Sequence, residues 1–511
     1  MTGTADNARR PPVVSRLVTA PADEMPPAAR KALLTDRNDD RRVVLVELRS
    51  HAGDDIAAIQ KRFLRLFREV FANQRVPRPV AVGRHYMRCV LTREQVTQLV
   101  GNGDGPRSES VLAALELIYH IWPDLIVEAH LDRSLTTIKA DAATRTYGCG
   151  GAGVVWAVLD SGIDGRHPHF ATHGTLSASV VAGLHRDFTV AAVPNPTRDP
   201  LTDVFGHGTH IAGIIAGQAP ADPSQLRIAT NEPTASGWPN WTSRTLSDAA
   251  TLSGVAPKAN LVSLKVLDDN GRALSSSIIE ALDYVRTVNN GGRDLVIHGV
   301  NLSLGCSWMP RDFAAGQSPL CKELDLLVGT GVVAVVSAGN AGAGAAGVGA
   351  GANVAGVTGD VYGQLSTITD PGNAAGAITV GSVHRYRPHT YGVTFDSSKG
   401  PTLDGRRKPE LVAPGERITS AATGHAAEGV PPLTPPAGAT GCADYIEQSG
   451  TSMAAAHVSG AIAAFMSTRT EFVGQPQMVR KVFTDSATDI GRHEFFQGAG
   501  VIDLMRALSS T

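Results

Sequence analysis

Five apolar runs, almost free of charged residues, constrain the fold of this chain more than any other feature. They cover residues 154–159, 261–267, 295–303, 332–336 and 377–380. Residues 275–288, between the second and third runs, place Ile278, Ile279, Leu282 and Val285 on one face of a helical pattern. Strands that are apolar throughout are buried on both faces, and their alternation with helices is typical of a parallel sheet. We therefore predict an α/β domain with a mostly parallel sheet.

Polar and glycine residues follow three of these runs at the points where the strands end. They are DSG at residues 160–162, SLG at residues 303–305 and SAGN at residues 337–340. In sheets of this kind, sites form at the carboxyl ends of the strands. We therefore expect the chemistry of this chain at that edge of the sheet.

Length and charge bound the classes of protein that remain. The chain has 511 residues, enough for a large core and an appended domain, and a net charge of −2. That charge gives no general attraction to nucleic acid or to an anionic membrane. The sequence has no stretch of 18 apolar residues, so no membrane span is expected. We expect neither nucleic acid nor a membrane as a partner.

The cysteines indicate free thiols rather than a disulfide framework or a zinc site. There are five of them, and none forms a CxxC pair. Cys306 and Cys321 bracket one loop and could pair, although free thiols are the expectation. The first residues, MTGTADNARRPPVVSRL, lack the apolar core and small-residue cleavage site of a secretion signal. These features favour a cytoplasmic location over a secreted one.

The chain divides into an arm and two folded domains. Residues 1–40 are polar, with several prolines and arginines, which is typical of a flexible arm. Residues 41–135 follow a β-α-β-α-β order, a small α+β domain, and residues 136–511 form the α/β domain. The small domain combines a strand at 42–48, a helix capped by Asp54 or Asp55, a strand at 86–91, a helix capped by Thr92, a second helical run and a strand at 125–129.

Two segments of the larger domain read as surface insertions. Residues 217–250 and 422–445 carry several prolines and show no periodicity. We predict that both are loops, which flank the site and shape access to it.

Ser452 lies in GTSMAAAHVSG, residues 450–460, where a glycine turn leads into an alanine-rich helix. Serine there could simply cap the helix. A nucleophilic serine would need a neighbouring base and a carboxylate that orients the base. His207, between two glycines in GHGTHIAG, is the candidate base, and Asp160, at the end of a buried strand, is the candidate acid. Each is common alone, but the order Asp, His, Ser is one of the known orders of the catalytic triad.

Seven ordered segments resemble those of the subtilisin-like serine proteases. They are VVWAVLDSGIDGRHPHF, DVFGHGTHIAGIIAG, SGVAPKANLVSLKVLD, VNLSLG, VVAVVSAGN, SSKGPTLDGRRKPELVAPG and SGTSMAAAHVSG. The closing QGAGVIDLMRAL is also typical of the family. The resemblance covers residues 140–511 and implies a three-layer α/β fold. In it, VNLSLG resembles the edge strand that pairs with the substrate backbone.

The resemblance implies a role for each matching residue. Asp160, His207 and Ser452 would be the triad, and Asn340 would donate its side-chain amide to the oxyanion, aided by the backbone N–H of Ser452 at the helix start. The pocket for the residue before the scissile bond would be lined by Ser303, Leu304, Gly305, Ala338 and Gly339, with Thr369 near its base. A pocket of this kind suits an uncharged side chain, and the peptide bond before Pro371 would be cis.

One position departs from the family pattern. Ala456 stands where the family usually has proline, just before His457. Proline is tolerated in the first helical turn and alanine is the best helix former, so we expect little effect on the chemistry. His457, and His210 in the first turns of the other helix, are interpreted as packed structural residues.

The small N-terminal domain resembles, more weakly, the ferredoxin-like propeptides of this family. These assist folding and inhibit the mature enzyme. The resemblance implies a tail after Leu131 in the active-site cleft and autocleavage between about residues 131 and 145. A permanent accessory domain is the alternative.

Two further motifs have plainer explanations. Residues 342–347 fit GxGxxG, but the glycine-rich continuation is poor helix material, so a loop is favoured over nucleotide binding. Residues 268–271, DDNG, lack the later ligands of a calcium loop and predict a turn. The chemistry requires no cofactor. Family members often bind structural calcium, but no complete ligand set is readable here, and the metal content stays open.

The sequence thus predicts a serine endopeptidase that acts through an acyl-enzyme on Ser452 and is regulated by its N-terminal domain. Its partners would be protein or peptide substrates and, in principle, a regulatory protein. Two alternatives remain: a catalytically silent binding protein with the protease fold, and an esterase that uses the same triad.

Overall fold

The computed structural model of this chain forms two compact units, Met1–Ala129 and His130–Thr511. The division lies a few residues before the boundary expected between residues 135 and 136. The structure describes residues 13–14, 34–36, 39–50, 55–82, 86–101, 109–123, 133–189, 199–222, 226–233, 239–244, 252–306, 314–345, 361–430 and 443–511.

The first unit contains a mainly antiparallel sheet of order β1-β6-β3-β5-β4, in which β2 also pairs with β3. Its strands are β1 (Val13–Val14), β2 (Leu34–Asp36), β3 (Asp39–Leu48), β4 (Val80–Val82), β5 (Tyr86–Leu91) and β6 (Ile118–Pro123). Strands β1 and β2 lie in the region predicted to be a flexible arm. The strand predicted at residues 125–129 falls outside the described residues, and the strand that the structure shows before it is β6, where Ile118 and Ile121 are buried.

Three helices of the first unit bury apolar faces in a core of their own. They are α3 (Ile56–Val70), α4 (Arg93–Leu99) and α5 (Glu109–Leu117). Asp55 caps α3 by accepting a hydrogen bond from the backbone N–H of Ala58. The predicted cap of α4 is confirmed, because Thr92 and Gln95 form a reciprocal capping box. Phe63 and Phe67 lie one turn apart on the buried face of α3.

The second unit is built on a seven-stranded parallel sheet of order β17-β16-β13-β12-β7-β11-β8. Its strands are β7 (Val155–Asp160), β8 (Arg186–Asp187), β11 (Asn260–Lys265), β12 (Gly299–Leu302), β13 (Val333–Ser337), β16 (Ile378–His384) and β17 (Leu411–Glu416). The five strands predicted from the apolar runs are all present. Strand β12 lies between β7 and β13, so the prediction that VNLSLG includes an edge strand is wrong for residues 299–302.

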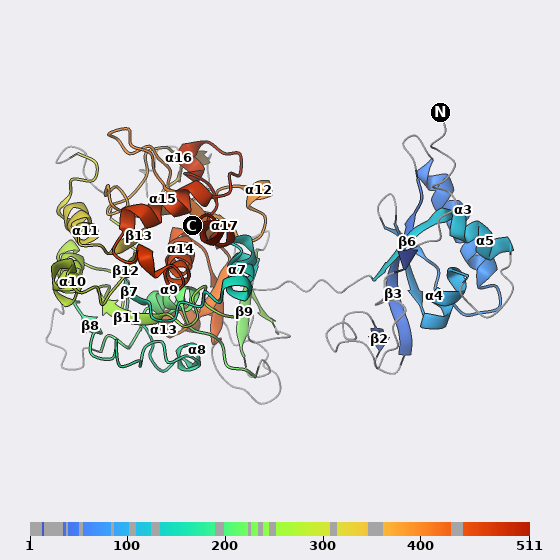
Figure 1. Ribbon diagram of the computed structural model, residues 1–511, viewed down its shortest axis with the longest axis horizontal. Coiled ribbons are helices and arrows are strands. Elements are labelled where there is room, and N and C mark those ends of the chain that lie inside the picture. The colour runs from blue at the N-terminus through green and yellow to red at the C-terminus, as the bar shows by residue number, and fades with distance from the viewer. Residues whose placement is uncertain are drawn as a thin grey trace. The chain divides into compact units, whose positions relative to one another are not determined.

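Helices cover both faces of this sheet and give the predicted three layers (Figure 1). Helices α10 (Ser275–Val288) and α11 (Pro319–Gly329) pack against one face, and α9 (His207–Ile215) and α14 (Thr451–Met466) against the other. Strand β7 shows how alternation serves both layers: Val155 and Leu159 join the α10 side, and Trp156 and Val158 join the α14 side.

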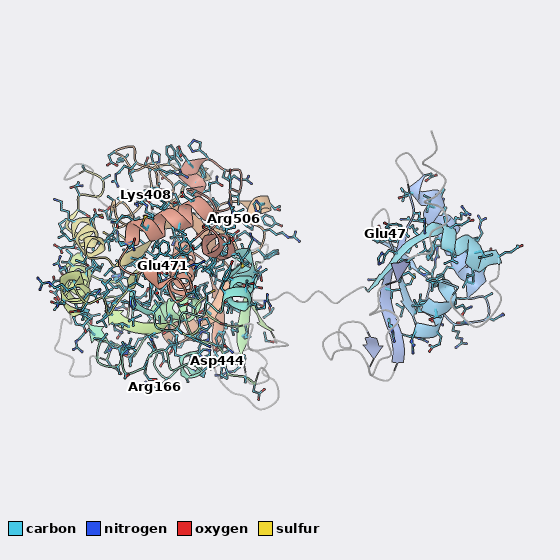
Figure 2. All side chains as sticks on the ribbon, viewed as in Figure 1. Glu47, Arg166, Lys408, Asp444, Glu471 and Arg506 are labelled. Carbon is cyan, nitrogen blue, oxygen red and sulfur yellow. The ribbon has the colours of Figure 1, made fainter. Side chains whose placement is uncertain are left out.

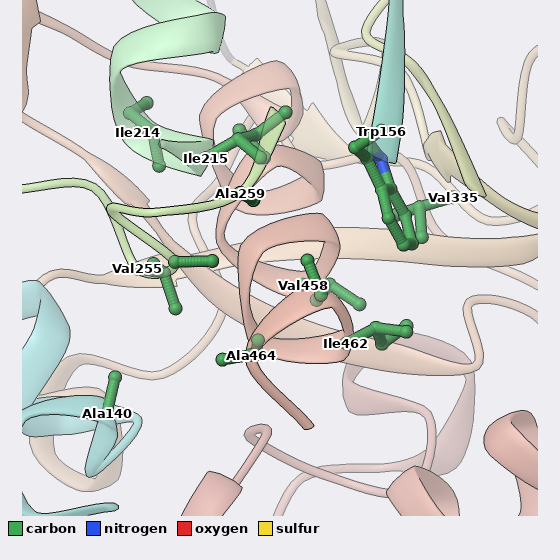
Figure 3. Close-up of a cluster of buried hydrophobic side chains, with 14 of the residues drawn as sticks. Ala140, Trp156, Ile214, Ile215, Val255, Ala259, Val335, Val458, Ile462 and Ala464 are labelled. Atoms are coloured by element: carbon green, nitrogen blue, oxygen red, sulfur yellow. The ribbon is translucent and has the colours of Figure 1, made fainter. Parts of the chain in front are cut away.

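Helix α14 is buried along nearly its whole length, with Ser452 as its one partly exposed residue. Its small side chains let it approach the sheet closely. Val458 and Ile462 face Trp156 of β7 and Val335 of β13 in the core (Figure 3). Small side chains are therefore needed for α14 to pack this closely against the sheet. This close packing also determines where the N-terminus of the helix lies relative to the strand ends.

A second, four-stranded sheet corrects the expectation that residues 217–250 form a loop, and in the segment 422–445 the structure shows helix α13 (Gly424–Glu428). The order of this sheet is β10-β9-β19-β18, formed by β9 (Ile228–Pro233), β10 (Pro239–Arg244), β18 (Ile418–Ala421) and β19 (Tyr445–Gln448). The hairpin of β9 and β10 is aligned by a hydrogen bond of 2.9 Å between the hydroxyls of Thr230 and Thr242. The hairpin is supported by the pairing of β9 with β19. Its own residues show no apolar alternation, so the sequence gives no local signal for these strands.

The remaining α-helices and strands described in the second unit are short or peripheral. They are α6 (Arg133–Thr137), α7 (Ala140–Tyr147), α8 (Pro168–Ala171), β14 (Ala343–Ala345), β15 (Val361–Gly363), α12 (Pro388–Tyr391), α13 (Gly424–Glu428), α15 (Pro476–Ser486), α16 (Glu494–Gln497) and α17 (Leu504–Ser509). In the part of the chain that the structure describes, no helix is both long and apolar enough to cross a membrane.

A buried ion network joins the segment just before β17 to α15. Lys408, labelled in Figure 2, donates to the carbonyl of Ala377 at 3.0 Å, to the hydroxyl of Thr379 at 2.9 Å and to the carboxylate of Glu410 at 3.0 Å. Arg480 donates to the other oxygen of Glu410 at 2.6 Å. Burial lowers the pKa of Lys408, and Glu410 opposes that shift. Both carboxylate oxygens are thus paired, as a buried charge requires.

We predict that Gly299→Ala lowers the free energy of unfolding by about 1–3 kcal/mol, because the new Cβ would lie 2.3–2.6 Å from ring carbons of the buried Trp156. Chemical denaturation measures the change. Gly329→Ala is the matched control, since its Cβ would meet no atom within 4 Å. An equal loss of stability in both variants would contradict the steric explanation.

Candidate active site

Asp160 ends β7 and lies 1% exposed beneath the carboxyl edge of the sheet. Its Oδ1 accepts a hydrogen bond of 2.8 Å from the backbone N–H of Ser161. The same carboxylate accepts from Nδ1 of His207, at 2.8 Å to Oδ1 and 3.0 Å to Oδ2. The buried strand therefore fixes a carboxylate that two donors compensate.

His207 is the first residue of α9, and the glycine after it permits this placement. A Cβ on Gly208 would lie 2.1 Å from the carbonyl oxygen of Gly162 and 3.1 Å from Cβ of Asp160. Because Asp160 is a carboxylate acceptor, Nδ1 of His207 carries the proton in this contact, and Nε2 is left as the basic nitrogen. The imidazole is one-fifth exposed, so that nitrogen can be reached.

A second buried carboxylate, Asp203, supports this pair, and the sequence interpretation missed it. Asp203 accepts from the backbone N–H of Gly206 at 2.7 Å and from the backbone N–H and hydroxyl of Thr209 at 2.8 and 2.7 Å. The hydroxyl of Ser161 also donates to it, at 2.8 Å. The signal was an acid placed just before a helix start, where N–H groups lack intrahelical acceptors.

Asp160 and Asp203 make it easier for His207 to carry a positive charge. Burial alone would lower its pKa, but the charge of Asp160, the hydrogen bond to Asp160 and the charge of Asp203 together raise the pKa above its ordinary value. Burial raises the pKa of Asp203, and the hydrogen bonds from Gly206 and Thr209 oppose that rise. The site therefore favours an imidazolium more than a solvent-exposed histidine would.

Ser452 is the second residue of α14, and Gly450 is the residue at the helix cap. Its hydroxyl donates to the carbonyl of Ser303 at 3.2 Å, and the hydroxyl of Ser303 donates back to the carbonyl of Ser452 at 2.9 Å. Among the hydrogen bonds of the described residues, none joins Ser452 to His207. Ser452 is not a helix cap by side chain, and its own N–H stands in the first turn, where no intrahelical acceptor exists.

Asn340 follows β13 and is exposed, with its amide oriented by the residue before Ser452. Its Oδ1 accepts from the backbone N–H and from the hydroxyl of Thr451, both at 3.0 Å. The hydroxyl of Thr451 accepts in turn from the N–H of Gly339 at 3.1 Å. With Oδ1 fixed in this way, Nδ2 makes no hydrogen bond with the described residues and is available as a donor near the N-terminus of α14, the end where the helix dipole favours negative charge.

The residues expected to line a substrate pocket are brought together. The N–H of Thr369 donates to the carbonyl of Ala338 at 3.1 Å. A Cβ on Gly305 or on Gly339 would lie 2.5 or 2.7 Å from Oγ1 of Thr369, so both glycines border the threonine side chain. Leu304 is partly exposed beside them. The peptide bond between Asp370 and Pro371 is cis, as expected.

The chain beyond β12 is anchored by Cys306 rather than by a neighbouring strand of the main sheet. Cys306 and Asp370 exchange backbone hydrogen bonds of 2.9 and 3.0 Å in an isolated antiparallel bridge. Cys306 is an exposed free thiol and Cys321 a buried one, so the pairing of the two is not formed. Cys442 lies outside the described residues.

The two other motif histidines are structural, as predicted. His210 is buried, and its Nε2 lies 3.1 and 3.2 Å from the carbonyl oxygens of Ile418 and Ile446. Burial, together with the charge of His207, lowers the pKa of His210 to about 3. His457 is buried and donates to the carbonyl of Met453, and burial lowers its pKa to about 4. Both are uncharged at neutral pH.

Of the two motifs set aside in the sequence, residues 268–271 form the expected turn, whereas part of the glycine-rich segment predicted to be a loop is a short strand. Residues 343–345 form β14, which pairs with β15, and residues 346–347 fall outside the described residues. Asp268 accepts from the N–H groups of Asn270 and Arg272 in a turn. Over the described ranges, no group of three or more His, Cys, Asp or Glu side chains is placed to hold a metal.

Comparison with known proteins gives the family of the chain. Residues 151–501 match the model of the subtilase family, which is more than half of the sequence. The chain belongs to this family of serine peptidases, and the three-layer α/β fold described above is the subtilisin-like fold.

Individual relatives are more distant. Subtilisin E of Bacillus subtilis is 28% identical over 73% of this chain and 70% of its own length. The serine protease AprX of the same species is 27% identical over 61% of this chain and 57% of its own. Pyrolysin of Pyrococcus furiosus is 33% identical over 56% of this chain but only 19% of its own. A solved cold-adapted subtilisin-like serine proteinase aligns with a TM-score of 0.41 at 21% identity, over 69% of this chain and 88% of that one.

We predict that Asp160→Asn lowers the pKa of His207 below its ordinary value near 6.5, because burial remains while the largest compensating charge is removed. Imidazole NMR titration of both proteins, each carrying Ser452→Ala to prevent proteolysis, measures the shift. His210 and His457 serve as internal controls that stay neutral at pH 5. An unchanged pKa of His207 would contradict the assigned electrostatics.

Proposed function

We propose that this chain is a serine endopeptidase in which Asp160, His207 and Ser452 form the catalytic triad. The observation that carries the proposal is the hydrogen bond between His207 and the buried Asp160, which leaves Nε2 of the imidazole as a base. Ser452, in the first turn of α14, is the serine that we propose it activates. Family membership supplies the reaction class, peptide hydrolysis by serine.

The mechanism starts with a rotation. The hydroxyl of Ser452 turns from the carbonyl of Ser303 toward His207, a rotamer change that a partly exposed side chain makes easily. Nε2 of His207 takes the hydroxyl proton while Oγ bonds to the carbonyl carbon of the scissile peptide. Asp160 stabilises the imidazolium that forms, and the negative charge of Asp203 adds to this stabilisation.

The oxyanion forms at the N-terminus of α14. Nδ2 of Asn340 and the backbone N–H of Ser452 donate to it, and such donors stabilise the transition state more than the substrate. The tetrahedral adduct collapses, His207 gives its proton to the departing amine, and an acyl-enzyme on Ser452 remains. Water, activated by His207 in the same way, then releases the acid.

The pocket residues favour an uncharged side chain before the scissile bond. Ala338 is fully buried, while Gly305, Gly339 and Thr369 border the same space and carry no charge. Extended peptides suit this site, because backbone groups beyond β12 can pair with a substrate strand. An esterase with the same triad would need no pairing with a substrate strand. A catalytically silent binding protein would not need the hydrogen bonds that orient the side-chain amide of Asn340.

We further propose that the N-terminal unit is a propeptide whose removal activates the enzyme. Its support is that residues 1–129 form a compact unit with a separate core. The interval in which we expect the cleaved bond, residues 131–145, can be narrowed by the contacts of residues 138 and 139. Ile138 is buried and its carbonyl accepts from the N–H of Leu504 at 3.0 Å, and Lys139 pairs with Asp503. The bond cut therefore precedes Arg133, where the helices of the catalytic unit begin.

We predict that purified wild-type protein loses its first 131 or 132 residues and that Ser452→Ala protein does not, because the acyl-enzyme cannot form without the hydroxyl. Intact mass and N-terminal sequencing of both proteins measure this. Activity on casein should fall by at least about 10³-fold in Ser452→Ala, since the nucleophile provides most of the rate.

Three results would count against these proposals. Casein cleavage by purified Ser452→Ala protein at the wild-type rate would exclude the assigned nucleophile. A full-length wild-type protein that cleaves casein would make the N-terminal unit a permanent domain. A start of the mature chain within residues 138–145 would contradict the packing of that segment.

A further inference from the structure

Lys399 is a buried lysine directly beside the loop that carries Asn340, and the proposed mechanism assigns it no role. It lies 4% exposed. Its ammonium donates to three backbone carbonyls: Gly342 at 2.8 Å, Phe395 at 3.0 Å and Ser397 at 3.1 Å. The ring of Phe496 lies 5.6 Å from the same nitrogen, which suits a cation–π contact.

These carbonyls belong to two different segments. Phe395 and Ser397 lie in the segment of Lys399 itself, whereas Gly342 is two residues beyond Asn340. The ammonium thus joins the Asn340 loop, residues 339–342, to residues 395–399. An ammonium with all three protons donated to carbonyls is a fixed connection, because each displaced proton would leave a buried donor unpaired.

The remaining contacts between the two segments run on both sides of Asn340. The N–H of Ser398 donates to the carbonyl of Gly339 at 2.8 Å, and the N–H of Ala341 donates to the hydroxyl of Ser398 at 3.0 Å. The N–H of Gly342 donates to the carbonyl of Asp396 at 2.9 Å. The backbone before and after Asn340 is therefore held by the segment that Lys399 ends.

The packing at Gly342 is too close for any other residue. A Cβ there would lie 1.9 Å from the carbonyl oxygen of Ser397 and 2.4 Å from Nζ of Lys399. This approach lets the ammonium reach the carbonyl of Gly342. It also means that the loop cannot relax toward residues 395–399 if the ammonium is lost, so the freed carbonyl would move away from them.

We propose that Lys399 is a positioning residue for the oxyanion hole. Its ammonium holds the backbone of the Asn340 loop, while Thr451 holds the amide oxygen, and the two anchors together fix where Nδ2 points. The inference rests on the proposed role of Asn340. Lys399 touches neither substrate nor reacting atoms, so it acts on the rate only through Asn340.

The first test is Lys399→Met, a substitution of similar length that removes the three donated hydrogen bonds. With a peptide p-nitroanilide carrying an apolar residue before the scissile bond, kcat should fall about tenfold with KM within twofold of wild type, because the loss is confined to the transition state. The affinity for the matching peptide aldehyde, whose adduct places an oxygen in the oxyanion hole, should fall in parallel. A kcat within twofold of wild type would overturn the proposal.

A double-mutant cycle separates positioning from general loss of structure. Asn340→Ala alone should lower kcat by about 10²–10³-fold. In that background Lys399→Met should have almost no further effect, since the group it positions is gone. An undiminished tenfold loss would show a structural role instead. If Asn340→Ala itself leaves kcat unchanged, the proposed oxyanion role fails, whatever Lys399 does.

Lys408→Met is the matched control, because Lys408 is also a buried lysine that donates to a backbone carbonyl, and none of the three partners described above belongs to the Asn340 loop. It should lower the thermal midpoint and leave kcat of the folded enzyme within twofold of wild type. A tenfold loss of kcat there as well would assign both losses to stability.

The pH dependence of kcat gives a further test of the same proposal. Burial lowers the pKa of Lys399, and the charge of Asp396 opposes that shift. Lys399 therefore loses its proton at a pH below the ordinary lysine pKa of about 10.4. The value of kcat should fall as the pH rises through this lowered pKa. Lys399→Met should lack this alkaline limb. Lys399→Gln, a shorter uncharged donor, should lack it too, and it decides the question if the methionine variant does not fold. An identical limb in wild type and variant would contradict the proposal.

Discussion

The hydrogen bond between Asp160 and His207 is the interaction on which the rest of the catalytic unit depends. A carboxylate buried at the end of a central strand is costly unless donors compensate it. Here the imidazole and the N–H of Ser161 do so. Because a tightly packed strand holds Asp160, the orientation of His207 and the nitrogen it presents are decided by the sheet and not by a surface loop. Asp203 is a second buried carboxylate that donors compensate, in this case N–H groups at the start of α9.

The second constraint is the placement of α14. Its small side chains allow it to run buried against the sheet, so its N-terminus stands at the same edge as the strand ends. That one helix start presents Ser452, supplies a backbone donor, and orients Asn340 through Thr451. The opposite side of Asn340 is held by the segment that ends at Lys399. The proposed oxyanion site is thus a junction of three segments far apart in the sequence.

Much of this could be predicted from the sequence, for physical reasons that differ by element. Apolar strands in a parallel sheet leave a local signal, and so do a carboxylate at the end of such a strand, a histidine between two glycines and a serine at a helix start, which is why Asp160, His207 and Ser452 could be proposed as site residues from the sequence. Asp203 and Lys399 were not, because their roles lie in contacts with distant backbone groups. The hairpin of β9 and β10 leaves no such signal in the sequence, because a neighbouring strand, and not its own alternation, supports it.

The central claim is that Ser452 is a nucleophile activated by His207. Labelling of the processed wild-type protein with a fluorophosphonate, followed by peptide mapping, tests it most directly, because this reagent reacts with an activated serine and not with an ordinary hydroxyl. The account predicts a single label on Ser452 that disappears in His207→Ala. A label on another serine, or equal labelling of Ser452 without His207, would contradict it.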